Sequence, residues 1–277
     1  MKKYLILTYA LIFYQMIIFP QMDSGYPACA LYLEGKGGIG TGFFVSDSAF
    51  LYLVTAGHVL SNINYYSDTL LILSYPRNPS ETKADTIKVI LSTFKKENRI
   101  LYHNNYDVVL LPFGKNVKVT FSGVTYFDGV YRYGNISSIN HFPIKEFKKF
   151  SEINIADECY LFGYPVSVGD PRDPQFIYSR PLVRKGIIAG KNLIKNTLII
   201  DCPVFQGNSG GPVSVVQGLN LYLVGLTIQF IPFLDEWENR KFKGLYNTEV
   251  ENSGLGVVIP VDYILELIEN FNTRVIR

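Results

Sequence analysis

The chain has 277 residues, a formal net charge of +2 and 18% charged residues. A chain of this length can bury a sizeable core in one large domain or in two small ones. Its Lys and Arg residues are scattered rather than gathered in one patch, which argues against a nucleic-acid-binding protein.

The first 25 residues have the pattern of an export signal. Two lysines, at positions 2 and 3, precede an uncharged apolar run at 4–19, as in a secretory signal peptide. We therefore expect an exported protein, periplasmic or secreted, that is cleaved near residues 22–25. The apolar run is slightly short for a membrane-spanning helix, but its retention as an N-terminal membrane anchor is an alternative. A buried N-terminal helix is a second alternative to the export signal.

Residues 26–127 contain short apolar or alternating runs separated by Gly, Asn, Asp, Ser or Pro. This pattern is typical of β-strands joined by turns. The 20 Tyr and 19 Phe, beside many Val, Ile and Leu, also favour strands. We expect six strands here, forming an N-terminal barrel or sandwich. They span 28–34, 40–47, 50–58, 69–75, 86–93 and 107–113.

The segment GKGGIG at 35–40 satisfies the glycine pattern of dinucleotide-binding loops. In such proteins the loop opens a helix, because the pyrophosphate binds at the helix N-terminus. The residues that follow, 41–47, have a strand pattern instead. The glycines therefore predict a hairpin turn, and we expect no nucleotide cofactor.

Two residues of the N-terminal half are candidates for acid–base chemistry. His58 ends the apolar run 50–58, after two small residues that leave room around its ring. Asp107 stands at the head of the otherwise apolar run 107–113, where a carboxylate is costly to bury without a partner. Each also has an ordinary structural explanation, as a packed histidine and as a cap at the start of a strand.

Residues 128–157 form a polar, aromatic segment that we expect to link two β domains or to be an insert between them. A second series of six short runs follows in 158–277 and predicts a C-terminal barrel. Only 261–276 has helical periodicity, and we expect a closing helix there. Its apolar face holds Val261, Ile264, Leu265, Ile268 and Phe271. The strands span 158–165, 181–190, 196–205, 210–216, 220–230 and 254–260.

The segment GNSGG at 207–211 surrounds Ser209 with small residues. It satisfies the G-x-S-x-G pattern of α/β-hydrolases, but those enzymes place their histidine after the serine. All three histidines of this chain precede Ser209, which excludes that fold. A serine nucleophile needs a base to take its proton, and the base needs an acceptor that orients it. Together, His58, Asp107 and Ser209 can fill these three roles.

The order His, Asp, Ser resembles the chymotrypsin-fold serine proteases, and within them the trypsin-like bacterial branch that includes the HtrA-type proteases. TAGHV, YDVVLL and GNSGGPV match the histidine, aspartate and serine motifs of that family. FGYP, DCPVFQGNSGGP, LVGLT and GLGVVIP lie in the family's order. The resemblance covers nearly the whole chain after the leader. Because no PDZ sequence follows, we expect a single protease domain.

The resemblance implies an all-β fold of two six-stranded antiparallel β-barrels with a C-terminal helix. The first barrel, 26–127, would carry His58 as general base and Asp107 as the acid that orients it, with Asp68 and Asp85 as alternative acids. The second barrel, 158–277, would carry Ser209 as nucleophile. Peptide bonds of a polypeptide substrate would be hydrolysed through an acyl-enzyme. The alternative is a catalytically silent protein that uses the same fold as an exported or membrane-tethered binding module.

The resemblance also implies the residues around the reacting carbonyl. The oxyanion hole would lie at Gly207, Asn208 and Ser209, with the backbone N–H groups of Gly207 and Ser209 as its donors. An Asn at position 208, where digestive relatives have an Asp, implies that no newly formed N-terminal amine is needed for activity. The substrate-binding residues would be Pro203, Gln206, Gly225, Leu226 and Thr227.

The residue at the base of the specificity pocket would be Pro203, which offers no charge to a Lys or Arg side chain. We therefore expect cleavage after small or medium apolar residues, although Asp201 lies close in sequence. Three histidines and three cysteines at wide spacings predict neither a metal site nor a disulfide framework. The cysteines, Cys29, Cys159 and Cys202, are expected to be buried in strands.

Overall fold

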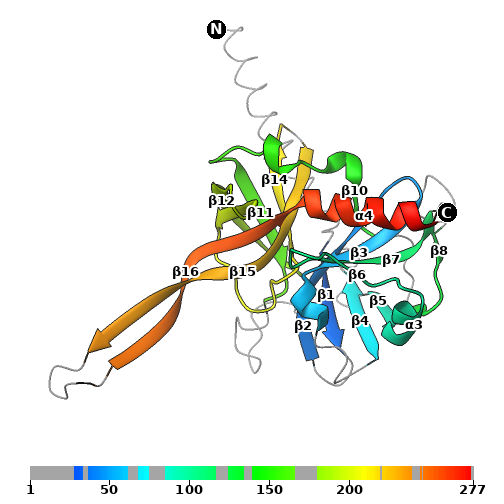
Figure 1. The fold of residues 1–277 in the computed structure, drawn as a ribbon, viewed down its shortest axis with the longest axis horizontal. Helices are drawn as coiled ribbons and strands as arrows, with labels where there is room; N and C mark the ends of the chain where they lie inside the picture. Colours follow the sequence, from blue (N-terminus) through cyan, green and yellow to red (C-terminus); the bar gives the residue numbers. More distant parts are fainter. Residues whose placement is uncertain are drawn as a thin grey trace, which may run out of the picture.

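Two curled β-sheets and a C-terminal helix form most of the described part of the chain in this computed structural model (Figure 1). The structure describes residues 28–33, 37–61, 68–74, 85–116, 124–133, 139–165, 180–218, 220–238, 244 and 246–275. The predicted export signal at 1–25 lies outside this part of the chain. None of the helices within it is long and apolar enough to cross a membrane.

The N-terminal sheet has ten strands within the described residues, in the order β6-β7-β3-β2-β1-β4-β5-β9, with β8 on β7 and β10 on β2. Neighbouring strands run antiparallel, except that the two-residue pair of β10 with β2 is parallel. The strands are β1 (Ala28–Leu33), β2 (Gly37–Ser46), β3 (Phe50–Thr55), β4 (Thr69–Ser74), β5 (Asp85–Ile90), β6 (Leu101–Tyr102), β7 (Val109–Asn116), β8 (Val124–Tyr126), β9 (Val130–Tyr133) and β10 (Phe142–Pro143).

This sheet confirms the all-β prediction but has four strands more than the six expected. The additional strands are β6, β8, β9 and β10, which are two to four residues long. Runs that short show no periodicity, and two of them, β9 and β10, lie in the segment 128–157 that was expected to be a linker or insert. The hairpin predicted for the glycines at 35–40 is confirmed, since β1 and β2 pair antiparallel with Leu33 opposite Gly37.

The C-terminal sheet is a closed barrel of six strands in the order β11-β12-β13-β16-β15-β14, as predicted. Its pairs are all antiparallel. The strands are β11 (Glu158–Gly163), β12 (Leu182–Asn192), β13 (Thr197–Asp201), β14 (Pro212–Gln217), β15 (Asn220–Glu238) and β16 (Tyr246–Pro260).

Strands β15 and β16 are much longer than expected. Their pairing continues beyond the barrel, from Pro232 opposite Asn252 to Glu238 opposite Tyr246. Figure 1 shows this part as a two-stranded ribbon that projects away from the body of the molecule. Sequence reasoning ended one strand at residue 230 and began the next at 254, because Pro232 and several charged residues interrupt the apolar pattern.

Helix α4 (Val261–Val275) follows the last strand of the C-terminal barrel but packs into the core of the N-terminal sheet. Phe271 meets the rings of Phe50 and Tyr52 edge-on, at centroid distances of 5.2 and 5.9 Å. The predicted apolar face is correct apart from Leu265, which is half-buried, while Leu267 is buried. The shorter helices are α2 (Gly57–Ser61), α3 (Leu91–Lys96), η4 (Ile144–Glu146) and η5 (Phe150–Glu152).

All three cysteines are buried and free, as predicted. Burial raises the pKa of Cys159 to about 12 and that of Cys202 to about 11, and it raises the pKa of Cys29 further still. Thiols in such surroundings stay protonated and unreactive at neutral pH. The cysteines therefore serve as small apolar residues of the two cores.

Candidate active site

His58 lies in the short helix α2 (Gly57–Ser61), not at the end of a strand as the sequence suggested. Strand β3 stops at Thr55, and the N–H of Val59 then bonds to the carbonyl of Ala56 to begin a helical turn. The His58 side chain is 48% exposed. Its ring is therefore accessible to a molecule that approaches from solvent.

Asp107 faces His58 with both carboxylate oxygens. Its Oδ2 lies 2.5 Å from Nδ1 of His58, and its Oδ1 accepts a 2.8 Å bond from the backbone N–H of His58. Burial raises the pKa of Asp107, but the hydrogen bonds and charge of His58, with the N–H of Gly57, outweigh burial and hold this pKa below its ordinary value. The ionised carboxylate keeps a proton on Nδ1, which leaves Nε2 free to accept one.

Neither alternative acid is seen to contact His58. The carboxylate of Asp68 accepts bonds from the backbone N–H and the hydroxyl of Ser92, at 2.6 and 2.5 Å. The side chain of Asp85 lies outside what the structure describes, and its backbone pairs with Ser74 between β5 and β4. The structure therefore favours Asp107 as the partner of the histidine.

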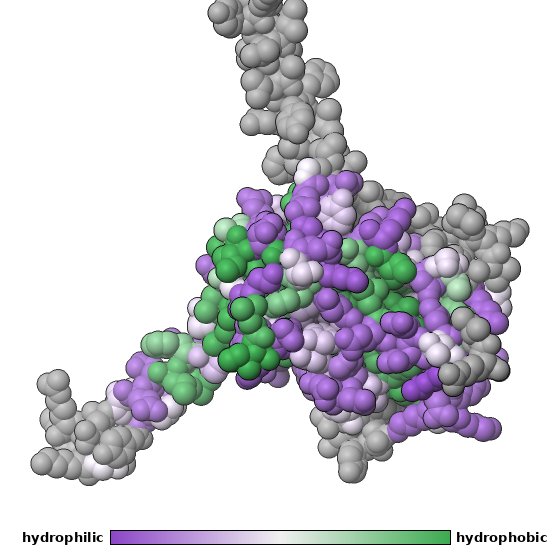
Figure 2. All heavy atoms as spheres, turned by 45° about the horizontal axis from the view of Figure 1, so that its top comes forward, coloured by the Kyte–Doolittle hydropathy of each residue, from purple (hydrophilic) through white to green (hydrophobic). Residues whose placement is uncertain are grey.

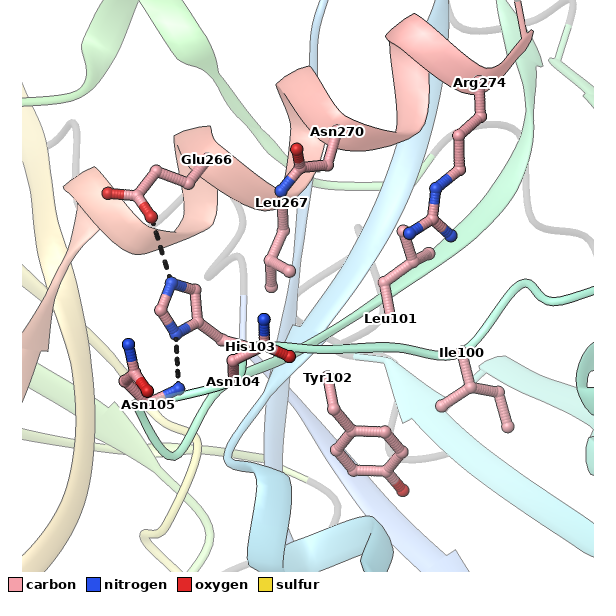
Figure 3. Close-up of a pocket in the computed structure, with 10 residues that line it drawn as sticks. All are labelled: Ile100, Leu101, Tyr102, His103, Asn104, Asn105, Glu266, Leu267, Asn270 and Arg274. Atoms are coloured by element: carbon pink, nitrogen blue, oxygen red, sulfur yellow. Dashed lines mark hydrogen bonds and ion pairs between the residues drawn. The ribbon is translucent and has the colours of Figure 1, made fainter.

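A second histidine supports the loop that carries Asp107. Nδ1 of His103 accepts bonds of 3.2 Å from the backbone N–H groups of Asn105 and Tyr106, and its Nε2 donates to Glu266 of α4 at 3.0 Å (Figure 3). His103, Asn105 and Glu266 border a cavity of about 340 Å³ between α4 and the segment 100–105. Sequence reasoning missed this support because Glu266 lies 163 residues further along the chain.

Ser209 lies in the turn between β13 and β14, and this turn is bonded to the N-terminal sheet. The carbonyl of Ser209 accepts a 2.9 Å bond from the N–H of Thr41 in β2, and the Thr41 hydroxyl donates to the carbonyl of Gly207 at 2.8 Å. Two buried bonds from a single residue of β2 thus hold the serine turn of one sheet against the other. The site is formed where the two sheets meet.

Gly40, the last glycine of the segment GKGGIG, permits this close approach. A Cβ at Gly40 would lie 2.8 Å from a methyl carbon of Val59 and 3.0 Å from the carbonyl oxygen of Ser209. Both distances are shorter than ordinary contacts of a Cβ atom. Because Gly40 has no side chain, helix α2, which carries His58, and the serine turn can both pack directly against it.

The hydroxyl of Ser209 donates to the carbonyl of Ile228 at 3.0 Å. No hydrogen bond joins it to His58, although both residues belong to the described chain. The register of β15 shifts between Thr227 and Gln229, so Ile228 is the additional residue of a bulge, and a bulge re-aims backbone groups. Sequence reasoning did not identify Ile228, because an apolar residue in a strand carries no signal for a backbone contact with a nucleophile.

The serine turn leaves two backbone donors without a partner in the described structure. Within 207–211, the N–H of Asn208 donates to the carbonyl of Phe205 at 2.9 Å, and the two glycines after the serine are bonded as well. The N–H groups of Gly207 and Ser209 remain, as the sequence predicted. Asn208, which was also expected in the oxyanion hole, does not offer a free donor there, because its N–H closes the turn. Its side chain is buried, and its Oδ1 has no hydrogen-bond partner in the described structure.

A family model for the trypsin-like peptidase domain matches residues 40–226, which is more than half of the chain. The chain belongs to this family. The matched range contains His58, Asp107 and Ser209. None of the curated proteins compared with the sequence matches it.

Solved serine proteases have the same fold as this trypsin-like domain. The serine endoprotease from Yersinia pestis is 18% identical with a TM-score of 0.51, and the match covers 93% of this chain and 65% of that one. The HtrA-type protease AlgW with a tripeptide is 16% identical with a TM-score of 0.51, covering 92% and 62%. This chain thus spans less than two thirds of these relatives, and at such identities the likeness establishes the fold.

The residues expected to bind substrate fall into two groups in the trypsin-like domain. Pro203 and Gln206 are exposed beside the serine turn. Gly225, Leu226 and Thr227 are buried within β15, so a contact with a substrate would involve their backbone groups.

The open part of β15 begins just after these buried residues. Pairing with β14 ends at Leu226, and the N–H of Thr227 still bonds to the carbonyl of Gly211. From Ile228 onward, this edge of β15 has no partner strand in the described structure. An unpaired edge can accept an extended peptide as an additional strand. Residues 228–230 place such an edge next to Ser209.

Proposed function

We propose that the chain is a serine endopeptidase that cleaves peptide bonds through an acyl-enzyme on Ser209. The observation that carries this proposal is the accessible His58–Asp107 pair, joined by two hydrogen bonds. His58 takes the hydroxyl proton as Ser209 attacks the scissile carbonyl, then gives it to the leaving amine. The N–H groups of Gly207 and Ser209 stabilise the oxyanion, and each such donor contributes about 10²–10³ in rate.

Catalysis requires that the Ser209 hydroxyl give up its hydrogen bond to the carbonyl of Ile228. The hydroxyl must leave the Ile228 carbonyl and turn toward Nε2 of His58, a change that a side-chain rotation can make. The same bond favours a second candidate, a catalytically silent member of the family that binds polypeptides. In that protein the serine would stay on the carbonyl, and the edge at 228–230 would hold a peptide without cleaving it.

Labelling of the full chain with a fluorophosphonate separates the two candidates, because this reagent phosphonylates only serines that a base activates, with loss of fluoride. We expect labelling of the wild type, none of Ser209→Ala and almost none of His58→Ala. Circular dichroism of the variants should match that of the wild type. A folded wild-type protein that takes up no label would leave the binding module as the function.

Substrate choice follows from the exposed residues beside the serine turn. We propose that Pro203 borders the pocket for the residue before the scissile bond and that the backbone of 228–230 binds the chain around it. Pro203 carries no charge, so we expect small or medium apolar residues at that position. Cleavage of a peptide library measures this preference. A profile dominated by Lys or Arg would assign the pocket to Asp201, which is also exposed.

We also propose that the peptidase acts outside the cytoplasm. The basic and apolar pattern of residues 1–25 supports export, with retention through 4–19 as the membrane-anchored alternative. Sequencing the N-terminus of the protein recovered from the exported fraction distinguishes cleavage near residues 22–25 from retention.

A further inference from the structure

The projecting ribbon of β15 and β16 has no other part of the described chain beside it. We call residues 232–238 and 246–252 the arm. Figure 1 shows the arm standing clear of both sheets, and no third strand pairs with it in the described structure. A two-stranded hairpin is marginally stable on its own in water. Because no other described segment covers the arm, both of its faces are available for contacts with another molecule.

The register of the arm assigns its side chains to two different faces. Residues directly opposite each other in an antiparallel pair share a face, and successive residues alternate between faces. Leu234, Glu236 and Val250 lie on one face. The other face, which we call the acidic–aromatic face, holds Phe233, Asp235, Trp237, Glu249 and Glu251.

The carboxylates of the acidic–aromatic face have no cationic partner among the residues that the structure describes. Asp235 lies directly opposite Glu249, and like charges in that position destabilise a ribbon. Within the described structure, Asp235 and Glu251 make no hydrogen bond or ion pair, and Glu249 accepts only from Asn247. A positively charged partner would remove this repulsion.

Two aromatic rings flank the carboxylates on the same face. Phe233 is 55% exposed and Trp237 is 49% exposed. Figure 2 shows apolar and polar residues side by side on the arm, away from the body. Exposed rings next to carboxylates favour Lys and Arg side chains, because the apolar stems pack on the rings while the charged groups meet carboxylates and ring faces.

The arm is the direct continuation of the strand next to the nucleophile. Ile228, whose carbonyl lies 3.0 Å from the Ser209 hydroxyl, begins the unpaired edge that leads into it. At about 3.3 Å per residue, Phe233 lies roughly 16 Å and Trp237 roughly 30 Å from Ile228 along the strand. An extended polypeptide can therefore span the serine and the arm with about five to ten residues.

We propose that the acidic–aromatic face binds an extended, basic segment of the polypeptide substrate and holds a neighbouring segment at Ser209. This proposal rests on the proposed peptidase function. The partner is basic because the face presents three carboxylates and two rings with no cation of its own in the described structure. The chain's own basic residues in the sequence between β15 and β16, Arg240, Lys241 and Lys243, are the competing occupant that the experiment must exclude.

The test of binding uses the full chain with Ser209→Ala, so that no peptide is cleaved. The chain has one tryptophan, Trp237, so its fluorescence reports the arm directly. A peptide with arginine at alternate positions should change this fluorescence in a saturable way, and increasing salt should weaken the binding. The same peptide with glutamate for arginine should give no change. Equal responses to both peptides would overturn the proposal.

Neighbouring residues on opposite faces supply matched controls. Asp235→Asn should weaken binding by about two- to fivefold, whereas Glu236→Gln, with the same change in charge, should not. Phe233→Ala should weaken binding by a similar factor, whereas Leu234→Ala, equally exposed at 55%, should not. Equal effects of the two charge changes would show general charge attraction, and equal effects of the two truncations would show that binding does not depend on the face; either result would contradict the proposal. Binding that appears only after Arg240, Lys241 and Lys243 are neutralised would assign the face to these residues of the chain itself.

Cleavage connects the face to the active site. A peptide with a cleavable bond about five to ten residues from an arginine-rich end should have a higher kcat/KM than the same peptide with glutamate for arginine. Two such peptides are tested, one with the arginine-rich end before the cleavable bond and one with it after the bond. Combining Asp235→Asn, Glu249→Gln and Glu251→Gln should abolish this advantage and leave fluorophosphonate labelling unchanged. Absence of fluorophosphonate labelling of the wild-type protein would contradict the peptidase function. A higher kcat/KM for the arginine-rich peptide that persists in the triple variant would contradict the proposed role of the arm.

Discussion

At the scale of single residues, the pair His58–Asp107 is held by more donors than a surface ion pair would have. The carboxylate of Asp107 accepts from the ring of His58 and from the backbone N–H groups of His58 and Gly57. Backbone donors cannot move away without unwinding helix α2, so the carboxylate and the ring keep one relative orientation. This rigidity is what a general base requires, because its tautomer and direction are set before substrate arrives.

Replacement of Asp107 by Asn should reduce fluorophosphonate labelling by about 10⁴-fold, because the ring can no longer hold its proton on Nδ1. The variant should also be less stable at pH 7. The folded pKa of Asp107 is lowered, so its carboxylate contributes stability above the ordinary pKa near 4 and loses it as the pH falls through the lower folded value. Urea unfolding at several pH values measures the difference between the two proteins.

The difference in stability between wild type and Asp107→Asn should therefore shrink in acid. A difference that stays constant below pH of about 3 would contradict the lowered pKa of Asp107. Asp68→Asn is the matched control, because its carboxylate bonds to Ser92 rather than to a histidine. That variant should keep the labelling rate of the wild type.

At the scale of elements, the serine turn depends on a close approach between two sheets. Gly210 has a φ of +85°, and a Cβ there would collide with the carbonyl oxygen of Thr41, the hydroxyl of Thr55 and the backbone nitrogen of Ala56. Its N–H donates to the carbonyl of Thr227 at 2.7 Å. The turn that presents Ser209 is therefore built against β2, β3 and β15 at once.

Gly210→Ala should destabilise the protein by about 4 kcal/mol or more, because both the conformation and the space are wrong for a side chain. Gly218→Ala is the control, since Gly218 also has a positive φ of +61° but has nothing within 4 Å of a Cβ. It should cost about 1–2 kcal/mol. Urea midpoints measure both, and similar costs would show that the contact with β2 and β3 is not tight.

The elements also show which features the sequence could reveal. His58, Asp107 and Ser209 stand in short motifs, so a shared site could be predicted without coordinates, and the structure brings His58 and Asp107 into contact. The supporting bond from His103 to Glu266 and the bond from Ser209 to Ile228 depend on distant segments, and no local pattern records them. The arm was missed because its strands are exposed on both faces, so they lack the apolar alternation that burial on one face produces.

At the scale of the whole molecule, the two sheets have separate apolar clusters that are joined where the sheets meet. Thr41 bonds the serine turn of the C-terminal barrel, and α4 returns from that barrel to pack on the N-terminal sheet. Leu223, Leu226 and Ile259 of the C-terminal barrel belong to the same apolar cluster as the N-terminal strands. Since the site lies between the sheets, its geometry depends on their staying together.

Phe271→Ala tests this cooperation, because Phe271 on α4 is buried against Phe50 and Tyr52 of β3. Loss of the ring should cost about 3–5 kcal/mol, and urea unfolding followed by circular dichroism should still show one transition. Hydrogen exchange should accelerate together in β3 and in β13, which belong to different sheets. Val275→Ala, at an exposed position near the end of the same helix, should shift the midpoint very little. Two separate transitions, or faster exchange confined to β3, would mean that each sheet unfolds alone.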